Sequence, residues 1–374
     1  ADYGENKQYT HGEVAQQIER FHKLFHQMGI NEGDKIAIAS RNCSNWVVSY
    51  MAILSYKAVA VTLLQDFKAD DLARLIKHSD AKMLFVGPFV WRELQHQELP
   101  ALEAIISMDD FSFIHLDESH KGRVEHIMQE ESALTENTFF SLVKGGTIDL
   151  DSLALINYTS GTTSNSKGVL IPYRALWSNV QFGQEKLGNI LKKGDNIISM
   201  LPMAHMYGMA FEFLFEFVNG CHIFFLTRIP SPKIIFKAFG EIKPRIVISV
   251  PLIIEKIIKK NVLPKLSTPS MKLLLALPVV QDKILSKVRQ QLVDAFGGNI
   301  YQVIVGGAAF NREVEQFLQK MGFPITVGYG ATECAPIISY ADWKEHRATS
   351  CGLPVPRMEI RIDSPNPQEV VGEI

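Results

Sequence analysis

The segment from Tyr158 to Gly168 concentrates chemical groups that bind phosphate. It reads Tyr-Thr-Ser-Gly-Thr-Thr-Ser-Asn-Ser-Lys-Gly, with one cation, Lys167. Hydroxyls and free backbone N–H groups donate hydrogen bonds to phosphate oxygens, glycine lets the backbone approach closely, and lysine supplies a mobile positive charge. The segment therefore predicts a phosphate-binding loop. Its candidate ligand-binding residues are Thr159, Ser160, Gly161, Thr162, Thr163, Ser164 and Lys167.

Strand-like patterns flank this loop, at residues 152–158 and 168–171. A Walker A loop would read G-x-x-x-x-G-K-[ST] and would open a helix. Here Ser166 stands in place of its second glycine, and Gly168 stands in place of its Mg-binding hydroxyl. The pattern therefore disfavours a Walker A loop. Taken alone, the segment is also compatible with a solvated turn rich in serine and threonine.

A run of small residues, Gly306-Gly307-Ala308, follows an expected strand at residues 300–305. Asn311 is a suitable N-cap for the helix expected next. Open α/β sheets bind ligands at the carboxyl ends of their strands, and glycine there lets a flat ring lie against the backbone. The same residues would also suit a tight turn between a strand and a helix. Alone, they are a weak signal.

Another expected strand, at residues 323–327, leads into a segment with three useful side chains. Tyr329 and Gly330 are followed by Thr332 and Glu333. An aromatic ring can stack on a base, a hydroxyl can donate to phosphate, and a carboxylate can bind Mg²⁺. The segment therefore predicts part of a nucleotide site.

The loop and the Tyr-Gly-Ala-Thr-Glu segment together resemble the signature motifs of the AMP-forming adenylate-forming enzymes. This superfamily includes acyl-CoA synthetases, luciferases and the adenylation domains of peptide synthetases. Its loop usually reads Y-T-S-G-T-T-G-x-P-K-G-V, from which this chain departs at Ser164 and Ser166. Both departures keep the hydrogen-bond donors and Lys167. The resemblance spans nearly the whole chain and implies ATP and Mg²⁺ as ligands.

The resemblance also implies a role for each matching residue. The small-residue turn would touch adenine, the tyrosine would lie beside that ring, and the threonine and glutamate would serve the phosphates and the metal. The implied nucleotide-binding residues outside the loop are Gly306, Gly307, Ala308, Tyr329, Gly330 and Thr332. The implied catalytic residues are Lys167, Thr332 and Glu333, and Glu333 is the implied metal ligand.

A histidine, His205, occurs in the segment Leu-Pro-Met-Ala-His after an expected strand at residues 197–200. A lone histidine among apolar residues is more often structural than catalytic. In acyl-CoA synthetases, however, a similar L-P-x-x-H segment places its histidine near the acyl carboxylate, so the resemblance gives His205 that role. The apolar side chains nearby would suit either the wall of an acyl tunnel or ordinary core packing. They are Met203, Met206, Tyr207, Met209 and Phe211.

Within the superfamily, the segment from Gly306 to Ile338 is most similar to bacterial long-chain fatty-acid–CoA ligases. The resemblance therefore implies ATP-dependent activation of a fatty acid to an acyl-adenylate and then to acyl-CoA, with CoA as co-substrate and release of AMP and pyrophosphate. One alternative is transfer of the acyl group to a carrier-protein thiol. Another is a binding module for nucleotide or acyl groups without catalysis.

The chain ends shortly after a turn-rich Ser-Pro-Asn-Pro segment, with a strand pattern beginning. In the resembled family, the aspartate that binds ribose, the hinge and a small C-terminal domain with its adenylation lysine would follow Ile374. We expect this fragment alone to bind ATP or acyl-adenylate weakly and to turn over poorly.

The elements that must position these motifs alternate between strands and helices. Short apolar runs at residues 36–39, 83–86, 246–250 and 273–277 have the pattern of strands buried on both faces. Amphipathic segments at residues 13–27, 282–296 and 312–321 have the pattern of helices. This alternation predicts an α/β fold in which helices cover mostly parallel sheets.

An internal repeat relates two parts of the chain, at roughly residues 12–90 and 175–340. Both Gly33-Asp34 and Gly194-Asp195 separate a helix pattern from a strand pattern, and a helix–strand alternation follows each. We therefore expect two related α/β subdomains, residues 1–150 and 151–340, with a surface excursion at 98–150. Residues 341–374 would start a smaller β-rich subdomain.

Composition limits the classes of partner. The chain has 374 residues, 47% of them hydrophobic, and a net charge of −2, so nothing predicts a nucleic-acid partner. Its four cysteines form no metal-binding or disulfide pattern, which favours the cytoplasm. Glu212 and Glu216 interrupt the most apolar stretch, so we expect no membrane span. A fatty substrate would suit transient membrane association, but no basic amphipathic anchor is evident, and the oligomeric state is undetermined.

Overall fold

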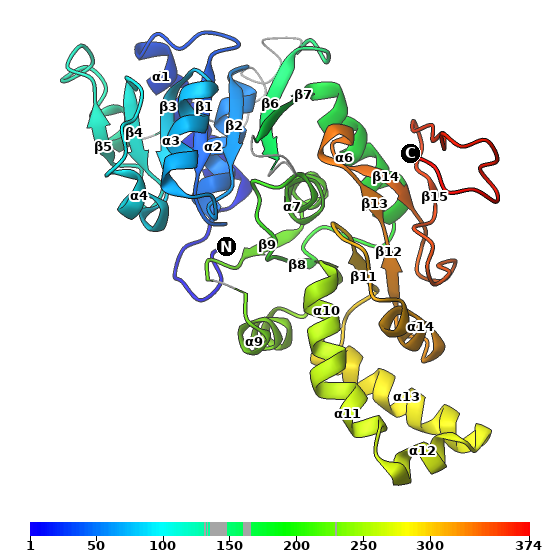
Figure 1. Ribbon diagram of the computed structural model, residues 1–374. Coiled ribbons are helices and arrows are strands. Elements are labelled where there is room, and N and C mark those ends of the chain that lie inside the picture. The colour runs from blue at the N-terminus through cyan, green and yellow to red at the C-terminus, as the bar shows by residue number, and fades with distance from the viewer. Residues whose placement is uncertain (131, 133, 135–147, 160–165, 229) are drawn as a thin grey trace. The chain divides into compact units, whose positions relative to one another are not determined.

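The computed structural model describes residues 1–374 except 131, 133, 135–147, 160–165 and 229 (Figure 1). The described residues confirm the predicted α/β fold. They form two compact units: residues 1–177, 199–213 and 223–230 make the first, and residues 178–198, 214–222 and 231–374 make the second.

A seven-stranded sheet, in the order β5-β4-β3-β1-β2-β6-β7, organises the first unit. Its five inner strands run parallel, and the edge strands β5 and β7 run antiparallel to their neighbours. The inner strands are β1 (Lys35–Ala39), β2 (Val59–Leu63), β3 (Ala81–Val86), β4 (Ala104–Ser107) and β6 (Leu153–Thr159), and the edge strands are β5 (Phe113–Leu116) and β7 (Lys167–Pro172). The sequence predicted no strand between residues 98 and 150, where β4 and β5 lie.

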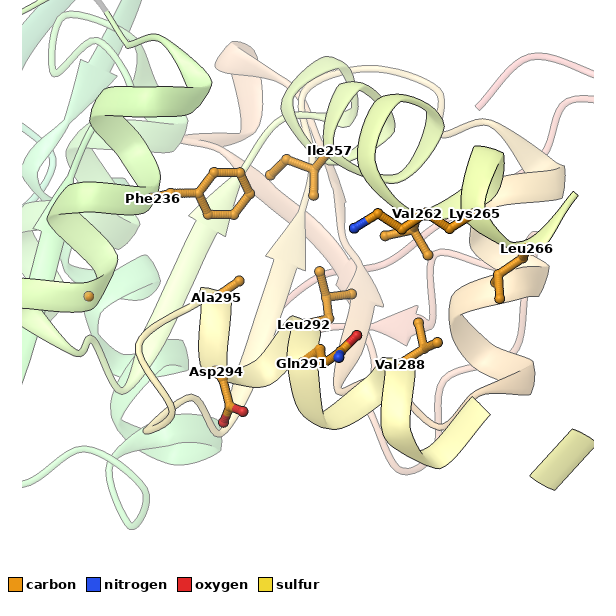
Figure 2. Close-up of a pocket in the computed structure, with 11 residues that line it drawn as sticks. Phe236, Ile257, Val262, Lys265, Leu266, Val288, Gln291, Leu292, Asp294 and Ala295 are labelled. Carbon is orange, nitrogen blue, oxygen red and sulfur yellow. The ribbon is translucent and has the colours of Figure 1, made fainter. Parts of the chain in front are cut away.

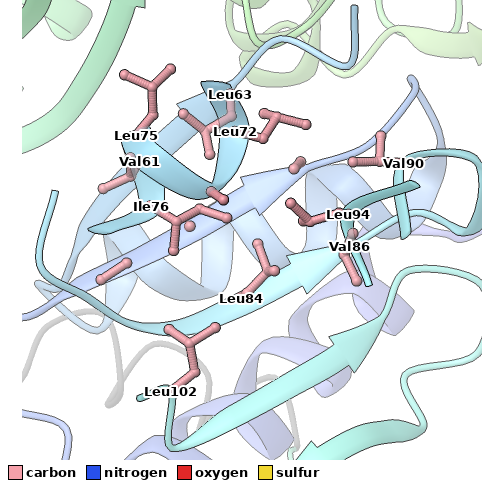
Figure 3. Close-up of a cluster of buried hydrophobic side chains, with 14 of the residues drawn as sticks. Val61, Leu63, Leu72, Leu75, Ile76, Leu84, Val86, Val90, Leu94 and Leu102 are labelled. Carbon is pink, nitrogen blue, oxygen red and sulfur yellow. The ribbon is translucent and has the colours of Figure 1, made fainter. Parts of the chain in front are cut away.

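Helices cover both faces of this sheet because its strands are apolar on both sides. In β3, Phe85 contacts Phe21 of α1 on one face, and Leu84 joins a buried cluster with α3 and α4 on the other (Figure 3). A capping box at Thr10 and Glu13 starts α1. The helices among the described residues of this unit include α1 (His11–Gln27), α2 (Ser44–Ser55), α3 (Ala69–His78), α4 (Pro88–Leu94), α7 (Met206–Met209) and the 3₁₀ turn Ile127–Gln129.

The second unit contains the parallel sheet β10-β11-β12 and the antiparallel sheet β13-β14-β15. The strands are β10 (Ile246–Ser249), β11 (Gln302–Val305), β12 (Ile325–Val327), β13 (Tyr329–Gly330), β14 (Ile337–Tyr340) and β15 (Leu353–Pro354). The helices include α8 (Phe215–Val218), α9 (Pro232–Ile242) and α14 (Arg312–Lys320). Helix α6 (Tyr173–Leu187), the π-helical turn Ala210–Leu214 and the paired strands β8 (Asn196–Ser199) and β9 (His222–Phe225) run through the chain positions where the units divide.

A helical arm, residues 251–295, leaves the carboxyl end of β10 and returns to β11 (Figure 1). Its elements are α10 (Pro251–Ile257), the π-helical turn Ile258–Val262, α11 (Leu263–Leu266), α12 (Pro269–Leu275) and α13 (Pro278–Ala295). The prediction of a buried strand at residues 273–277 was wrong. Pro269 fits the first turn of a helix and Thr268 caps it by accepting from Met271 N at 3.4 Å, so the leucines that follow lie in α12.

The helix–strand order predicted for the two repeats is present. In the first, α1, β1, α2, β2, α3 and β3 follow one another, and in the second α6, β8, α7 with α8, β9, α9 and β10 do so. The strands pair differently, because β1, β2 and β3 share one sheet whereas β8 and β9 form a pair and β10 belongs to another sheet. The duplication and the subdomain boundaries therefore stay predictions.

A buried carboxyl group, Glu216 of α8, lies in the apolar stretch that the sequence marked as interrupted. Its side chain is 1% exposed, and burial raises its pKa to about 8. In an unfolded chain a glutamic acid titrates near ~4.3. The folded state therefore holds the proton over a pH range in which the unfolded state has lost it, and stability falls as the pH rises from about 4.3 to about 8.

Replacing Glu216 by glutamine should remove this pH dependence. We expect Glu216→Gln to match the wild type near pH 4 and to exceed its free energy of unfolding by at least ~1 kcal/mol at pH 8, because the amide cannot ionise. Urea denaturation across this pH range measures the difference. The exposed Glu359→Gln is the matched control, and equal pH profiles for Glu216→Gln and the wild type would contradict the prediction.

Candidate active site

The predicted phosphate loop connects two antiparallel strands, as the sequence indicated. β6 and β7 pair so that Tyr158 lies opposite Gly168 and Thr159 opposite Lys167. The side chain of Lys167 is exposed at the start of β7. The loop residues Ser160, Gly161, Thr162, Thr163 and Ser164 lie outside the described residues. The hairpin thus places the two ends of the loop beside each other.

Tyr158 fixes the point where the loop leaves the sheet. Its ring is 2% exposed, and its hydroxyl lies 2.7 Å from Nδ1 of His78 on α3. A Cβ atom on the opposite residue, Gly168, would come within 3.2 Å of the tyrosine ring, so glycine suits this close approach. The first residue of the motif therefore acts as an anchor for the strand, and the hydroxyls of the loop follow it.

The segment that carries His205 lies on the carboxyl edge of the same parallel strands. Asn42, just after β1, donates from Nδ2 to the carbonyl of Leu201 at 2.6 Å and accepts at Oδ1 from Met203 N at 2.9 Å. Asn157 of β6 donates to the carbonyl of Ala204 at 2.7 Å. The structure thus brings the histidine segment to the strand from which the phosphate loop emerges.

A buried carboxylate supports the start of this segment. Oε2 of Glu212 accepts hydrogen bonds from the backbone N–H groups of Met200 and Leu201, at 2.9 Å and 2.8 Å. The Glu212 side chain is 0% exposed. From the sequence, Glu212 served only to disfavour a membrane span, and Asn42 and Asn157 had no predicted role. The available signal was the occurrence of polar residues inside apolar stretches.

His205 itself is exposed and caps α7. Its Nδ1 accepts a hydrogen bond from Tyr207 N at 3.2 Å. Partial desolvation by the surrounding protein lowers the pKa of His205 below its ordinary value. A neutral ring that accepts at Nδ1 carries its proton on Nε2, and this tautomer can donate a hydrogen bond to a carboxylate.

The apolar side chains around His205 are all buried in the structure. Met203, Met206 and Met209 are 0% exposed, Phe211 is 4% exposed and Tyr207 is 9% exposed. Core packing and the wall of an acyl tunnel both require such burial, so the two alternatives that the sequence left open stay predictions.

In the second unit, the small-residue turn lies at the carboxyl edge of β10, β11 and β12. Gly306 N donates to the carbonyl of Ser249 on β10 at 3.1 Å, and Gly328 N donates to the carbonyl of Val305 on β11 at 2.9 Å. Gly307 has a φ of +84°, which favours glycine, and both Gly307 and Ala308 are exposed. The turn therefore presents backbone at the edge where α/β sheets bind ligands.

The Tyr-Gly-Ala-Thr-Glu segment begins at the same edge. Tyr329 and Gly330 form β13, which pairs antiparallel with β14, and a 3₁₀ turn, Thr332–Cys334, connects the two strands. A Cβ atom on Gly330 would lie 2.2 Å from the carbonyl oxygen of Pro336, so only glycine fits. Asn179 of α6 accepts at Oδ1 from Ile337 N at 3.2 Å and is 4% exposed. Asn179 is a further positioning residue that sequence reasoning missed.

The candidate side chains of this segment are accessible. Tyr329 is 37% exposed, Glu333 is exposed and Thr332 is partly exposed. Within the described part of the chain, the Glu333 carboxylate forms no ion pair, and no group of three His, Cys, Asp or Glu side chains is placed to hold a metal. A single accessible carboxylate fits Mg²⁺, which usually binds one or two carboxylates together with substrate phosphates.

A separate pocket of about 400 Å³ lies among the helices of the second unit (Figure 2). It is walled by α9, by α13 and by the segment from α10 to α11. Apolar side chains such as Phe236, Ile257 and Leu292 line most of it. None of the predicted site residues is among its lining residues, so this pocket is not the predicted nucleotide site.

Parallel strands with ligand-binding motifs at their carboxyl ends define a nucleotide-binding α/β protein. The family described as AMP-binding enzyme matches residues 1–374. This chain belongs to that family. The sequence therefore indicated the family correctly.

Individual relatives narrow the comparison. Long chain acyl-CoA synthetase 5 of Arabidopsis thaliana is 27% identical over 95% of this chain and 56% of its own length. Long-chain-fatty-acid–CoA ligase FadD15 of Mycobacterium bovis is 24% identical over 94% of this chain and 60% of its own. The benzoate CoA ligase structure from Burkholderia xenovorans LB400 aligns with a TM-score of 0.69 at 17% identity, over 95% of this chain and 62% of that one. The chain thus spans little more than half the length of the relatives it matches.

The predicted site residues divide between the two units. The first unit carries Thr159, Lys167 and His205, and the second carries the glycine turn with the Tyr329–Glu333 segment. The structure brings together the members of each group. The roles of the individual residues stay predictions.

Removing the Asn42 amide should destabilise the first unit. Asn42→Ala leaves the carbonyl of Leu201 and the N–H of Met203 buried without this partner, so we expect a loss of about 1–3 kcal/mol in the free energy of unfolding. Urea denaturation measures it. Asn31→Ala, at an exposed asparagine of the same unit, should change stability by less than about 0.5 kcal/mol. Equal losses in the two variants would contradict the prediction, because the buried amide would then contribute no more to the free energy of unfolding than an exposed one.

Proposed function

We propose that the full-length protein activates a long-chain fatty acid with ATP and transfers the acyl group to CoA. The carboxylate attacks the α-phosphorus of ATP and pyrophosphate leaves. The thiol of CoA then attacks the acyl carbon and AMP leaves. The first step replaces an oxide, which is a very poor leaving group, with AMP, which is a good one.

This proposal rests on one hydrogen bond. Asn157 lies on β6, the strand that leads into the phosphate loop, and its amide holds the backbone next to His205. Asn157 lies two residues before Thr159, and it bonds to the carbonyl of Ala204. A donor for a carboxylate and a loop for phosphates are thereby supplied from one edge of one sheet. Carboxylate activation by ATP needs these two groups in one place.

Lys167 is the proposed cation for the phosphates of ATP. It lies at the end of the loop, where it is exposed and held in register by β6. An ammonium group there neutralises charge on the pyrophosphate as that group departs, and the loop hydroxyls orient the phosphates. The neutral His205 donates from Nε2 to the acyl carboxylate and so orients it for attack.

The second unit provides the proposed adenine and metal contacts. The Gly306–Ala308 turn receives the adenine ring, Tyr329 lies beside that ring, and Thr332 donates to a phosphate. Glu333 fits as a ligand of Mg²⁺, which when bound neutralises the negative charge of the phosphates. In-line transfer of this kind depends more on positioning and charge neutralisation than on covalent help.

The long-chain substrate is supported by the names of two relatives, a long chain acyl-CoA synthetase and a long-chain-fatty-acid–CoA ligase. Transfer to a carrier-protein thiol is the second enzymatic possibility. A binding module without catalysis is the third, and the loop departures at Ser164 and Ser166 are the observation that favours it. Pyrophosphate exchange separates the two enzymatic possibilities from the binding module, and the thiol that accepts the acyl group separates the two enzymatic possibilities from each other.

Pyrophosphate exchange tests the adenylation step and its residues. In the full-length protein, Lys167→Ala and Glu333→Gln should each lower kcat/KM for fatty-acid-dependent ATP–pyrophosphate exchange by about 10²-fold or more, because each removes charge stabilisation from the transition state. Lys77→Ala removes an exposed lysine of the first unit, which also carries Lys167, and should leave the exchange unchanged. Absence of exchange in the wild type with every fatty acid would favour the binding module.

The acceptor and the chain length can be resolved with the same protein. We expect exchange to be fastest with fatty acids of long chain and product formation to require CoA, because a long apolar chain adds binding energy that a short one cannot supply. Measurement of acyl-thioester formation with CoA and with a phosphopantetheinylated carrier protein separates the acceptors. Preference for aryl acids or for the carrier protein would contradict the proposal.

A further inference from the structure

The tip of the helical arm exposes apolar side chains that the fold leaves uncovered within the second unit. Figure 1 shows α12 where the chain turns back, at the end of the arm away from the sheet of β10, β11 and β12. Around this turn Leu273 is 73% exposed, Leu274 42%, Leu277 54% and Val279 71%. No other stretch of seven described residues exposes four large apolar side chains. Such a patch is unfavourable in water and marks an interaction surface.

The chain around the tip is held in a defined conformation. Pro269 and Pro278 occupy the first turns of α12 and α13, and the side chain of Gln281 donates to the carbonyl of Leu275 at 2.9 Å. The exposed apolar side chains are therefore presented by the end of α12 and the start of α13. Ordered presentation lowers the entropy lost when the tip binds a partner.

The arm also carries a strong excess of positive charge. Residues 251–295 contain eight basic and three acidic residues, whereas the whole chain has a net charge of −2. The side chains of Lys256, Lys259, Lys260, Lys283 and Lys287 are exposed. Of these, Lys259 pairs with Glu255 at 3.3 Å, and the described residues show no ion pair for the others. The excess is local, so the overall charge of the chain conceals it.

We propose that the tip of this arm docks on a lipid surface that contains anionic headgroups. The apolar side chains of α12 and of the start of α13 enter the headgroup region, and the lysines along the arm face the negative lipids. Apolar contact and electrostatic attraction together give reversible binding of an element that lies in the interface. The charge of the arm selects this partner, because an exposed apolar tip on its own would fit any apolar surface.

The mode of binding is interfacial. Among the described residues, no helix combines the length and the apolar character needed to cross a bilayer. The helix α12 has seven residues, so it reaches only the outer region of the membrane. This inference stands independently of adenylation, although a docked enzyme would be placed beside a pool of lipid-dissolved fatty acids.

Vesicle co-sedimentation of the full-length protein tests the proposal. The wild type should bind vesicles of phosphatidylcholine with 30% phosphatidylglycerol far more tightly than vesicles of phosphatidylcholine alone, and salt should weaken the binding. The double variant Leu273→Asp/Val279→Asp should bind the anionic vesicles at least tenfold more weakly. Lys283→Gln/Lys287→Gln should also lose at least tenfold, because each lysine near an anionic surface contributes roughly fivefold in the binding constant.

Two control variants separate docking from general effects. Leu353→Asp/Val371→Asp places the same two negative charges at side chains that are 76% and 98% exposed outside the arm, and Lys192→Gln/Lys193→Gln removes two exposed lysines elsewhere in the same unit. Both should bind anionic vesicles like the wild type. Thermal unfolding shows whether each variant is folded. Neither vesicle binding nor thermal unfolding depends on adenylation, so failure of docking and failure of adenylation can be told apart.

Three results would overturn the proposal. The first is a wild type that does not bind anionic vesicles. The second is a folded Leu273→Asp/Val279→Asp variant that binds them as tightly as the wild type. The third is a wild-type oligomer, detected by sedimentation, that dissociates in this variant while vesicle binding is absent, which would assign the tip to an interface between copies.

Discussion

Buried amide groups at the carboxyl edge of the first sheet constrain the arrangement of the candidate site. Asn42, just after β1, bonds to the backbone of Leu201 and Met203, and Asn157 of β6 bonds to the backbone of Ala204. Buried backbone groups need partners, and a segment without regular secondary structure cannot supply them itself. These side chains therefore fix the course of the chain before His205. The position of the histidine relative to the strand that leads into the phosphate loop follows from these bonds.

In the second unit, different contacts position the segments of the candidate site. Its turn and its Tyr-Gly-Ala-Thr-Glu segment both start where parallel strands end, and backbone bonds between neighbouring strands align them. Gly330 permits a close approach to Pro336, and Asn179 binds the returning strand. Among the described residues proposed to touch substrate, Lys167 and His205 of the first unit and Tyr329 and Glu333 of the second are exposed, whereas the amides that position these segments are buried. This division allows the proposed contact residues to reach a ligand without loss of the support beneath them.

In the helical arm, the secondary structure and the charge differ from what the local residue pattern and the net charge of the chain indicate. Its run of leucines has the composition of a buried strand, yet Pro269 and Pro278 confine the run to a short helix and a turn. The sheets of the described residues include no strand that pairs with it. The result is an apolar tip beside a cluster of lysines. The net charge of the whole chain hides this local positive charge. The apolar tip and its lysines can therefore be identified as one surface only when the exposure of each side chain is known.

The sequence alone determined the α/β class, the strands on both sides of the phosphate loop, and the family. These depend on local patterns: apolar runs, glycine at turns, and motifs whose spacing is carried by the chain. Tertiary structure decided which residues support the motifs. Asn42 and Asn157 are far apart in sequence and have no motif of their own, so only the pairing of β1, β2 and β6 brings them beneath the segment of His205. Exposure of Leu273 was likewise decided by packing, because an apolar residue is buried only where the fold provides a partner.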